Sequence, residues 1–127
     1  MFSIRSITVD CVDPYRMASF WTEVTGWPED PDDPNRPGDP AGRIVSVHGI
    51  SLLFIPVPEA KAVKNRLHLD LIPTSGTRDS EVTRLVGIGA TIVADQRRPD
   101  GKGWVVLADP EGNEFCVERS AAERGTG

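Results

Sequence analysis

Apolar and polar residues alternate from position 4 to position 11, with Ile7 and Val9 separated by polar neighbours. This period of two predicts a strand with one apolar and one polar face. Asp13 and Pro14 form a typical helix start, and apolar residues then recur at helical spacing as far as Gly26. A buried helix is therefore expected to follow the first strand.

Proline stands at every third position from 28 to 40, among several acidic residues. Because proline has no backbone donor, this segment cannot form an interior strand and is expected to be an extended, solvated loop. Residues 43–48 and 50–55 then predict a hairpin with Gly49 at its turn.

The same order of patterns begins again at Arg66. Alternation, a helix, a short strand and a second hairpin are predicted at 66–71, 77–87, 90–94, and 104–108 with 114–119. Aligning Gly49 with Gly112 places Leu53 opposite Cys116, so the chain resembles two copies of one unit. The tail at 121–127 has no pattern and is expected to be loose.

Two helices cannot cover both faces of so many strands, so each sheet must turn one face toward something else. Followed strand by strand, that face carries mostly polar side chains: Ser6, Thr8, Asp10, Ser51, Leu53, Ile55, Arg66, His68, Asp70, Glu114, Cys116 and Glu118. Such a face is either solvated, as in many antiparallel sheets, or it lines a cup that binds a ligand.

The composition narrows the classes of function. The 127 residues carry a formal net charge of −5 without a basic stripe, which argues against a nucleic acid or an anionic membrane as partner. No apolar run has membrane-spanning length, and the N-terminus lacks the pattern of a signal peptide, so a cytoplasmic location is predicted. Cys11 and Cys116 are expected to be free thiols.

Two motifs carry a family resemblance most strongly, Lys-Asn-Arg-Leu-His-Leu-Asp at 64–70 and Asp-Pro-Glu-Gly-Asn at 109–113. Shorter matches lie at 9–14, 18–21, 25–27, 57–61 and 89–90. Together they resemble the vicinal oxygen chelate superfamily, the glyoxalase / bleomycin-resistance / extradiol-dioxygenase fold, and within it a glyoxalase-like subgroup common in actinobacterial proteins.

The resemblance implies an α+β fold of two tandem βαβββ modules, forming a curled mixed sheet around a ligand cup. It implies a single domain over 1–127, with module one at about 1–58 and module two at about 66–120. It also implies a homodimer.

Metal-dependent members of the superfamily place one ligand in each of four strands, which the resemblance carries over to Ser6, Leu53, His68 and Cys116. The ligands expected there are His, Gln or Glu, and only His68 matches. Leu53 cannot coordinate a metal and Ser6 is a poor ligand, whereas Cys116 could bind zinc as a thiolate. Since catalytic zinc usually has three protein ligands, we predict no cofactor, with a divalent metal at the weak candidate His68 left open.

The predicted function is therefore that of a metal-independent protein that binds or sequesters a partly hydrophobic organic ligand. The residues expected to contact it are Thr8, Leu53, Arg66, His68, Asp70, Trp104 and Cys116. The alternatives are a metal-dependent lyase, isomerase or dioxygenase of the superfamily, and a structural or regulatory module whose cup is vestigial.

Individual residues keep two interpretations each. His68 either contacts the ligand or is an ordinary hydrogen-bonded histidine, and Trp104 either stacks on a ligand or belongs to the core. Asp10 and Asp70 could supply a general base, but neutralisation by Arg5 or Arg66 is the favoured interpretation. An inert buried thiol is favoured for Cys116.

Overall fold

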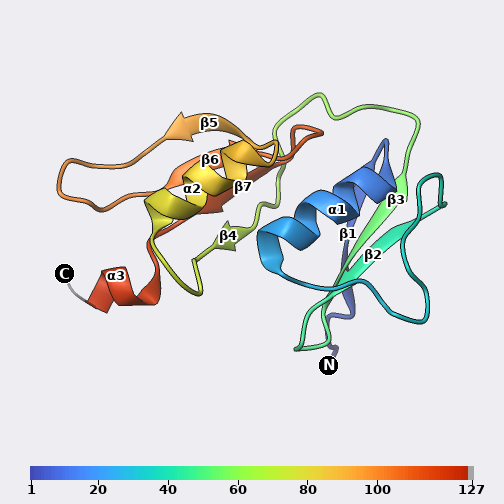
Figure 1. Cartoon of the computed structure of the whole chain (residues 1–127). Coiled ribbons are helices and arrows are strands. Elements are labelled where there is room, and N and C mark those ends of the chain that lie inside the picture. Colours follow the sequence, from blue (N-terminus) through green and yellow to red (C-terminus); the bar gives the residue numbers. More distant parts are fainter. Residues whose placement is uncertain (126–127) are drawn as a thin grey trace. The chain divides into compact units, whose positions relative to one another are not determined.

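A computed structural model describes residues 1–125 of the chain (Figure 1). The chain divides into two compact units, unit 1 at Met1–Lys61 and unit 2 at Ala62–Gly127. Each unit contains a β-sheet of its own.

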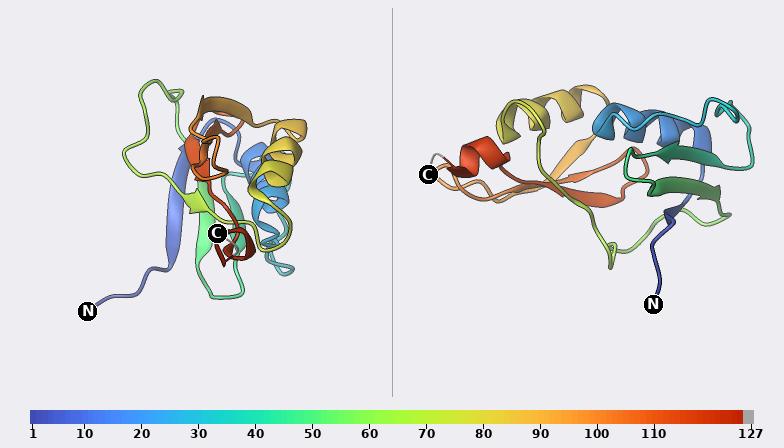
Figure 2. Two further views of the ribbon diagram at one scale, coloured as in Figure 1. Left: turned by 90° about the vertical axis from the view of Figure 1, so that its left-hand side faces the viewer. Right: turned by 90° about the horizontal axis from the view of Figure 1, so that it is seen from below.

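Unit 1 contains β1 (Ser6–Cys11), α1 (Pro14–Thr25), β2 (Gly42–Val45) and β3 (Ser51–Pro56). Its sheet has the order β1-β3-β2, in which β1 runs parallel and β2 antiparallel to β3. The register pairs Thr8 with Leu53, so these two residues lie side by side on one face. Figure 2 shows α1 along one face of this sheet.

Helix α1 begins and ends where its sequence predicts. The Asp13 carboxylate accepts a hydrogen bond from the backbone N–H of Arg16 at 3.1 Å, and Gly26 ends the helix in the left-handed region at φ 73°. Met17, Phe20 and Trp21 are buried, together with Ile44, Leu52 and Phe54 of the sheet. The aromatic stripe of the helix is therefore core packing.

The proline-rich segment 28–40 contains no strand, as predicted, but several bonds fix it in place. The Asn35 side chain accepts from the backbone N–H of Arg43 at 3.0 Å and donates to the carbonyl of Arg43 at 2.8 Å. The Pro28 carbonyl accepts from Val45 N–H at 2.9 Å. The Asn35 amide thus hydrogen-bonds the N–H and C=O groups of Arg43 at the outer edge of β2, where another strand would otherwise pair.

Unit 2 contains β4 (Asp70–Leu71), α2 (Arg78–Gly87), β5 (Thr91–Asp95), β6 (Val105–Ala108), β7 (Glu114–Val117) and α3 (Ala121–Gly125). Its sheet has the order β4-β7-β6-β5, with β4 parallel to β7 and the other pairs antiparallel. Helix α2 lies along one face of this sheet (Figure 2) and buries Val82 and Leu85. The α+β class with mixed sheets is confirmed.

The predicted strand at 66–71 is wrong over 66–69, because β4 has only two residues. Leu67, expected on the core face, is 89% exposed. Pairing with β7 begins at the Leu69 carbonyl, which accepts from Cys116 N–H at 2.9 Å. Before that point the Glu114 carboxylate accepts from Asn65 N–H at 3.0 Å, so a side chain replaces the backbone ladder.

The expectation of a loose tail is wrong for residues 121–125, which form α3. Ser120 and Glu123 cap this helix reciprocally. The Glu123 carboxylate accepts from Ser120 N–H at 2.7 Å, and the Ser120 hydroxyl accepts from Glu123 N–H at 3.1 Å. Residues 126 and 127, also in the predicted tail, lie outside the described residues.

The cysteines and the hydropathy of the helices agree with the sequence predictions. Cys11 and Cys116 are free thiols, and both are buried. In the described part of the chain, no helix combines the length and the hydropathy that crossing a bilayer requires.

Candidate functional site

The register of unit 2 brings three potential ligand groups together. Parallel pairing of β4 with β7 sets Asp70 beside Cys116, and the Nδ1 atom of His68 lies 3.5 Å from the Asp70 carboxylate. Donor atoms of His68, Asp70 and Cys116 all lie within 4.8 Å of one another. We refer to these three residues as the His-Asp-Cys cluster.

The electrostatic surroundings keep the Cys116 thiol protonated. Burial raises the pKa of this thiol most, and the negative charge of Asp70 and a hydrogen bond to Asp70 raise the pKa further. Lys64 opposes this shift of the pKa, while Glu118 adds to it. The protonated Cys116 thiol is therefore a poor nucleophile. The negative charges of Asp70 and Glu118 favour a cation at this position.

The donors of the cluster fit a divalent transition metal. One imidazole, one carboxylate and one thiol make three ligands, which is the usual number at a catalytic zinc. Nitrogen and sulfur donors suit zinc better than manganese or magnesium, which prefer oxygen. The residues that the family resemblance carries over offer only His68 and Cys116 as ligands. The predicted alternation over 66–71, which put His68 and Asp70 on one face, was the signal for the third ligand.

The other predicted contact residues are not members of this cluster. Thr8 and Leu53 are paired neighbours on β1 and β3 of unit 1. Arg66 is exposed in the segment before β4. Trp104, 37% exposed, is no core residue, and it lines an open pocket of unit 2.

The favoured pairing of Asp10 and Asp70 with arginines is wrong. Within residues 1–125, neither Arg5 nor Arg66 forms an ion pair, and the partner of Asp70 is His68. Arg66 is exposed and lies outside the strand that would have fixed its position beside Asp70.

The Asp-Pro-Glu-Gly-Asn motif is a structural turn that positions β7. Asp109 is 4% exposed, and one of its carboxylate oxygens accepts from the N–H groups of Glu111 at 2.9 Å and Asn113 at 3.0 Å. Gly112 has φ 92°, a conformation that favours glycine. The turn fixes the start of β7 and thereby the placement of Cys116.

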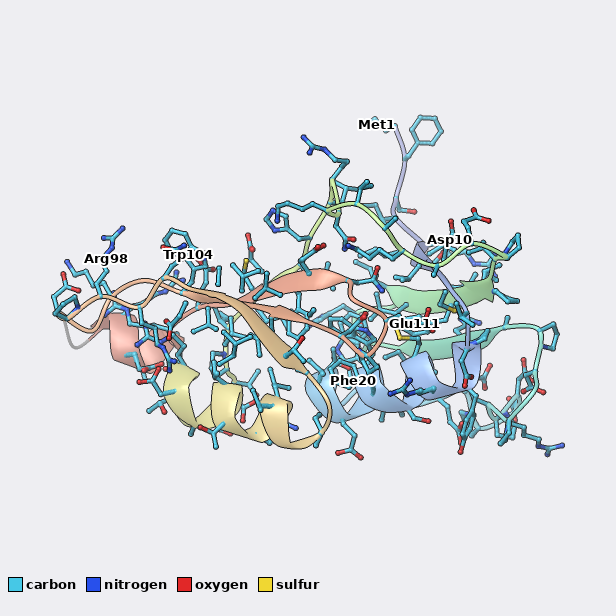
Figure 3. The ribbon with its side chains drawn as sticks, turned by 90° about the horizontal axis from the view of Figure 1, so that it is seen from above. Met1, Asp10, Phe20, Arg98, Trp104 and Glu111 are labelled. Atoms are coloured by element: carbon cyan, nitrogen blue, oxygen red, sulfur yellow. The ribbon has the colours of Figure 1, made fainter. Side chains whose placement is uncertain are left out.

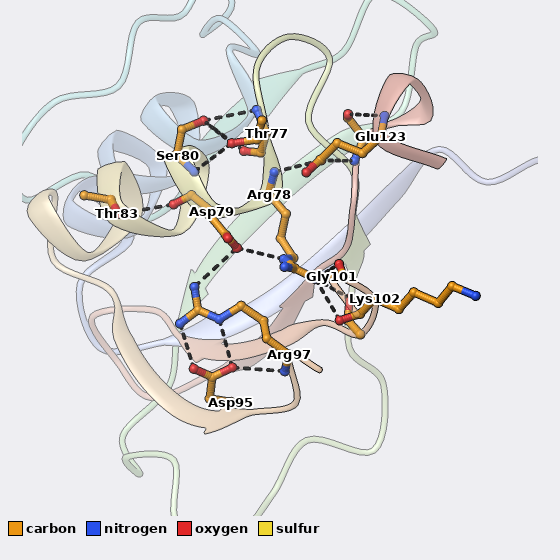
Figure 4. A network of polar contacts seen from close by, with 12 residues as sticks. Thr77, Arg78, Asp79, Ser80, Thr83, Asp95, Arg97, Gly101, Lys102 and Glu123 are labelled. Atoms are coloured by element: carbon orange, nitrogen blue, oxygen red, sulfur yellow. Dashed lines mark hydrogen bonds and ion pairs between the residues drawn. The ribbon is translucent and has the colours of Figure 1, made fainter. Parts of the chain in front are cut away.

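Arg78 is a buried charge that the sequence analysis missed. It is 4% exposed, and its Nη1 donates to the carbonyls of Gly101, Lys102 and Gly103 at 3.0 to 3.1 Å. Its Nε donates to Asp79 at 2.9 Å (Figure 4). No local pattern indicates this role, since the three carbonyls lie more than twenty positions along the chain.

The same network continues across the surface of unit 2. Arg97 donates to Asp79 at 3.3 Å and to Asp95 at 2.7 Å. Hydrogen bonds from Arg97 lower the pKa of Asp95 to about 2. The pKa of Asp79 is also lowered, chiefly by its hydrogen bond from Arg78.

A family model described as a glyoxalase-like domain matches residues 6–118. No curated protein matches the chain. Among solved structures, a glyoxalase/bleomycin resistance protein/dioxygenase family enzyme from Burkholderia phytofirmans is 18% identical, with 91% of this chain and 97% of that chain covered and a TM-score of 0.69.

Two further solved structures are fosfomycin resistance proteins named FosX. The protein from Listeria monocytogenes, a variant in complex with Mn(II) and 1S,2S-dihydroxypropylphosphonic acid, is 13% identical, with 98% of this chain and 94% of that chain covered and a TM-score of 0.69. The protein from Mesorhizobium loti is 15% identical, with 100% and 99% covered and a TM-score of 0.68. At these identities the likeness concerns the fold.

Proposed function

Because the chain belongs to the glyoxalase-like domain family, we propose that it binds a small organic ligand at a divalent metal ion held by His68, Asp70 and Cys116. The observation that carries this proposal is the convergence of three donors of suitable type within 4.8 Å. Zinc is the metal that this mixed donor set fits best.

Each residue of the cluster has a distinct task in this proposal. The imidazole of His68 and the carboxylate of Asp70 offer one nitrogen and one oxygen ligand, and a cation replaces the proton of the Cys116 thiol. The carboxylate that raises the thiol's pKa in the absence of a cation thus favours the cation. A bound metal would supply Lewis-acid polarisation of a ligand oxygen.

The fold of the relatives is compatible with such a centre, since the FosX protein from Listeria monocytogenes carries Mn(II) together with a small phosphonic acid. The thiol ligand distinguishes the proposed centre from one built for manganese.

A metal-independent binding protein is the second candidate, and one observation favours it. His68 and Asp70 have 41% and 56% exposed side chains and are already paired with each other. In this form the polar face of unit 2 would bind its ligand by hydrogen bonds alone, with Arg66, His68 and Asp70 as contacts.

Metal analysis separates the two candidates. We expect protein purified without chelators to carry about one zinc per chain by mass spectrometry. His68→Ala and Asp70→Asn should lose this metal. Asp10→Asn is the matched control, because it removes an exposed carboxylate from a strand of unit 1, and it should keep the metal. Protein without stoichiometric metal, and without a thermal shift on adding Zn²⁺, Ni²⁺ or Mn²⁺, would leave the metal-independent candidate standing.

We further propose that residues 1–127 act as one domain, that two chains form a homodimer, and that the protein is cytoplasmic and belongs to the actinobacterial subgroup. These proposals rest on the family resemblance. Light scattering coupled to size-exclusion chromatography measures the mass of the particle, and a monomer at micromolar concentration would contradict the dimer.

A further inference from the structure

Unit 2 contains an open pocket of about 400 Å³ that shares no lining residue with the His-Asp-Cys cluster. Its lining residues are Arg98, Gly103, Trp104, Glu118, Arg119 and Arg124. Figure 3 shows Arg98 and Trp104 on the side of the sheet opposite α2. We refer to it as the arginine-tryptophan pocket.

Strand alternation relates this pocket to the cluster. Glu118 follows Cys116 by two positions, and Trp104 precedes Val105, which pairs with Val117. The register therefore sets Trp104 opposite Glu118 on the sheet face that carries Cys116.

The pocket holds more positive than negative charge, in a chain whose net charge is −5. Glu118 pairs with Arg124 at 3.3 Å, which neutralises one of the three arginines. In the part of the chain that the structure describes, no carboxylate pairs with the side chains of Arg98 or Arg119. Arg119 is nevertheless half-buried. Two guanidinium groups thus remain available to an anion from outside.

Trp104 adds a flat apolar surface to this charge. Its side chain is 37% exposed, although it stands next to the fully buried Val105. A guanidinium group binds carboxylate and phosphate oxygens through paired N–H donors, and an indole ring stacks on other rings. A guanidinium group next to an indole ring therefore suits a ligand in which an oxyanion is attached to a flat ring.

Arg78 fixes two walls of the pocket at once. Its guanidinium group binds the carbonyls of residues 101–103, in the loop that carries Arg98 and leads to Trp104. Its backbone N–H donates to Glu123 at 2.9 Å, in the helix that carries Arg124 (Figure 4). A pocket whose walls are already held in place loses less entropy when it binds a ligand.

We propose that the arginine-tryptophan pocket binds an organic ligand that carries a carboxylate or phosphate-type group on a flat ring. Arg98 and Arg119 hold the oxyanion, and Trp104 covers the ring. Arg78 is a positioning residue. The inference goes beyond the proposed function and does not depend on a metal at the His-Asp-Cys cluster.

Nuclear magnetic resonance tests the pocket directly. Benzoate, phenyl phosphate, inorganic phosphate and neutral phenol are titrated into the ¹⁵N-labelled protein. The indole N–H signal of Trp104 is assigned through Trp104→Phe. We expect saturable shifts of this signal with benzoate or phenyl phosphate, weaker binding of inorganic phosphate, and none with phenol. The stronger of the two ring compounds identifies the preferred oxyanion.

Matched variants show whether the guanidinium group of Arg119 is responsible for binding the oxyanion. Arg119→Gln should weaken the binding of the better ring compound about tenfold, and Arg119→Lys should recover only part of the loss. Arg36→Gln, which removes an exposed arginine of unit 1, should leave binding unchanged. Circular dichroism confirms that each variant folds.

Two outcomes would overturn the proposal. The first is the absence of any shift at millimolar benzoate and phenyl phosphate, and the second is an equal loss of binding in Arg36→Gln. Asp70→Asn should retain oxyanion binding. A protein that fails the metal test can therefore still confirm the pocket, and one that fails this titration can still hold its metal.

Discussion

Units 1 and 2 share a backbone arrangement but differ in chemistry at matching places. In each unit the first strand runs parallel to the last, β1 with β3 and β4 with β7. The register pairs Thr8 with Leu53 in unit 1 and Asp70 with Cys116 in unit 2. A hydroxyl and a hydrocarbon thus stand where the other unit has a carboxylate and a thiol. The apolar face of each sheet specifies the fold, and the opposite face is free to differ.

The two units also hold their loops in different ways. In unit 1 a neutral amide, Asn35, satisfies the edge of β2 through both backbone groups of Arg43. In unit 2 a buried guanidinium group, Arg78, satisfies three carbonyls of the loop between β5 and β6. A buried charge costs more to lose than a neutral amide, because its removal leaves several polar groups unpaired.

The largest expected change in the free energy of unfolding comes from the cores, because each unit buries a phenylalanine there. Phe54 is fully buried in unit 1 and Phe115 is 1% exposed in unit 2. Because each fills a packed core, Phe54→Ala and Phe115→Ala should each lower the free energy of unfolding by about 4 kcal/mol. Guanidinium denaturation followed by tryptophan fluorescence measures both values.

Leu53→Ala is the control for these two variants, since Leu53 is only half-buried on the opposite face. It should cost about 1 kcal/mol. If one phenylalanine variant lowered the free energy of unfolding as little as this control, the two cores would not be equivalent. The premise that the two units share one kind of core would then be wrong.

Local pattern predicted those features of the fold that depend on neighbouring residues. The helix start at Asp13 and Pro14, its end at Gly26 and the turn at Gly49 are all decided within a few positions. The Ser120–Glu123 cap of α3 is equally local, and its Ser-x-x-Glu spacing was a signal that could have been used.

Contacts between distant residues were beyond the reach of local pattern. Glu114 ends the pairing of β4 by binding Asn65 N–H, 49 positions away. Nothing in the sequence near Arg78 indicates a special role, and only the fold brings the carbonyls of residues 101–103 to it. At the candidate site, alternation alone assigned His68, Asp70 and Cys116 to one face. Their closeness required the register of β4 with β7.

An intermediate effect should sharpen the contrast between the two loop anchors. Arg78→Met should lower the free energy of unfolding by about 3 kcal/mol, because it strips three carbonyls of this donor and leaves Asp79 with Arg97 alone. Asn35→Ala should cost about 1 kcal/mol, since the two backbone groups it leaves can reach water. Denaturant titration of both variants checks the difference.

Arg84→Met serves as the control for the loss of an arginine from α2. Arg84 binds Glu81 on the helix surface, and its removal should cost roughly 0.5 kcal/mol. Equal costs for Arg78→Met and Arg84→Met would mean that Arg78 does not anchor the loop, and its assignment as a positioning residue of the arginine-tryptophan pocket would be lost with it.

The smallest expected effect is a dependence of stability on pH that originates in unit 2. The pKa of Asp95 is lowered to about 2 by hydrogen bonds from Arg97, and that of Asp79 is lowered too. A carboxyl group with a lowered pKa stabilises the fold above its unfolded pKa, near 4, and this contribution is lost as the pH falls toward 2. Asp95→Asn should therefore reduce the loss of stability between about pH 4 and pH 2.

Because Asp95 and Arg97 lie at the surface, salt should weaken this effect, and its size should be small. Asp32→Asn is the control from unit 1: in residues 1–125 its carboxylate pairs with no cation. Thermal melts from pH 2 to pH 5 at low and high salt compare the two variants. An identical acid dependence in both would place the acid-sensitive groups outside the Asp79–Arg97–Asp95 network, and the electrostatic difference between the units would then not reach their stability.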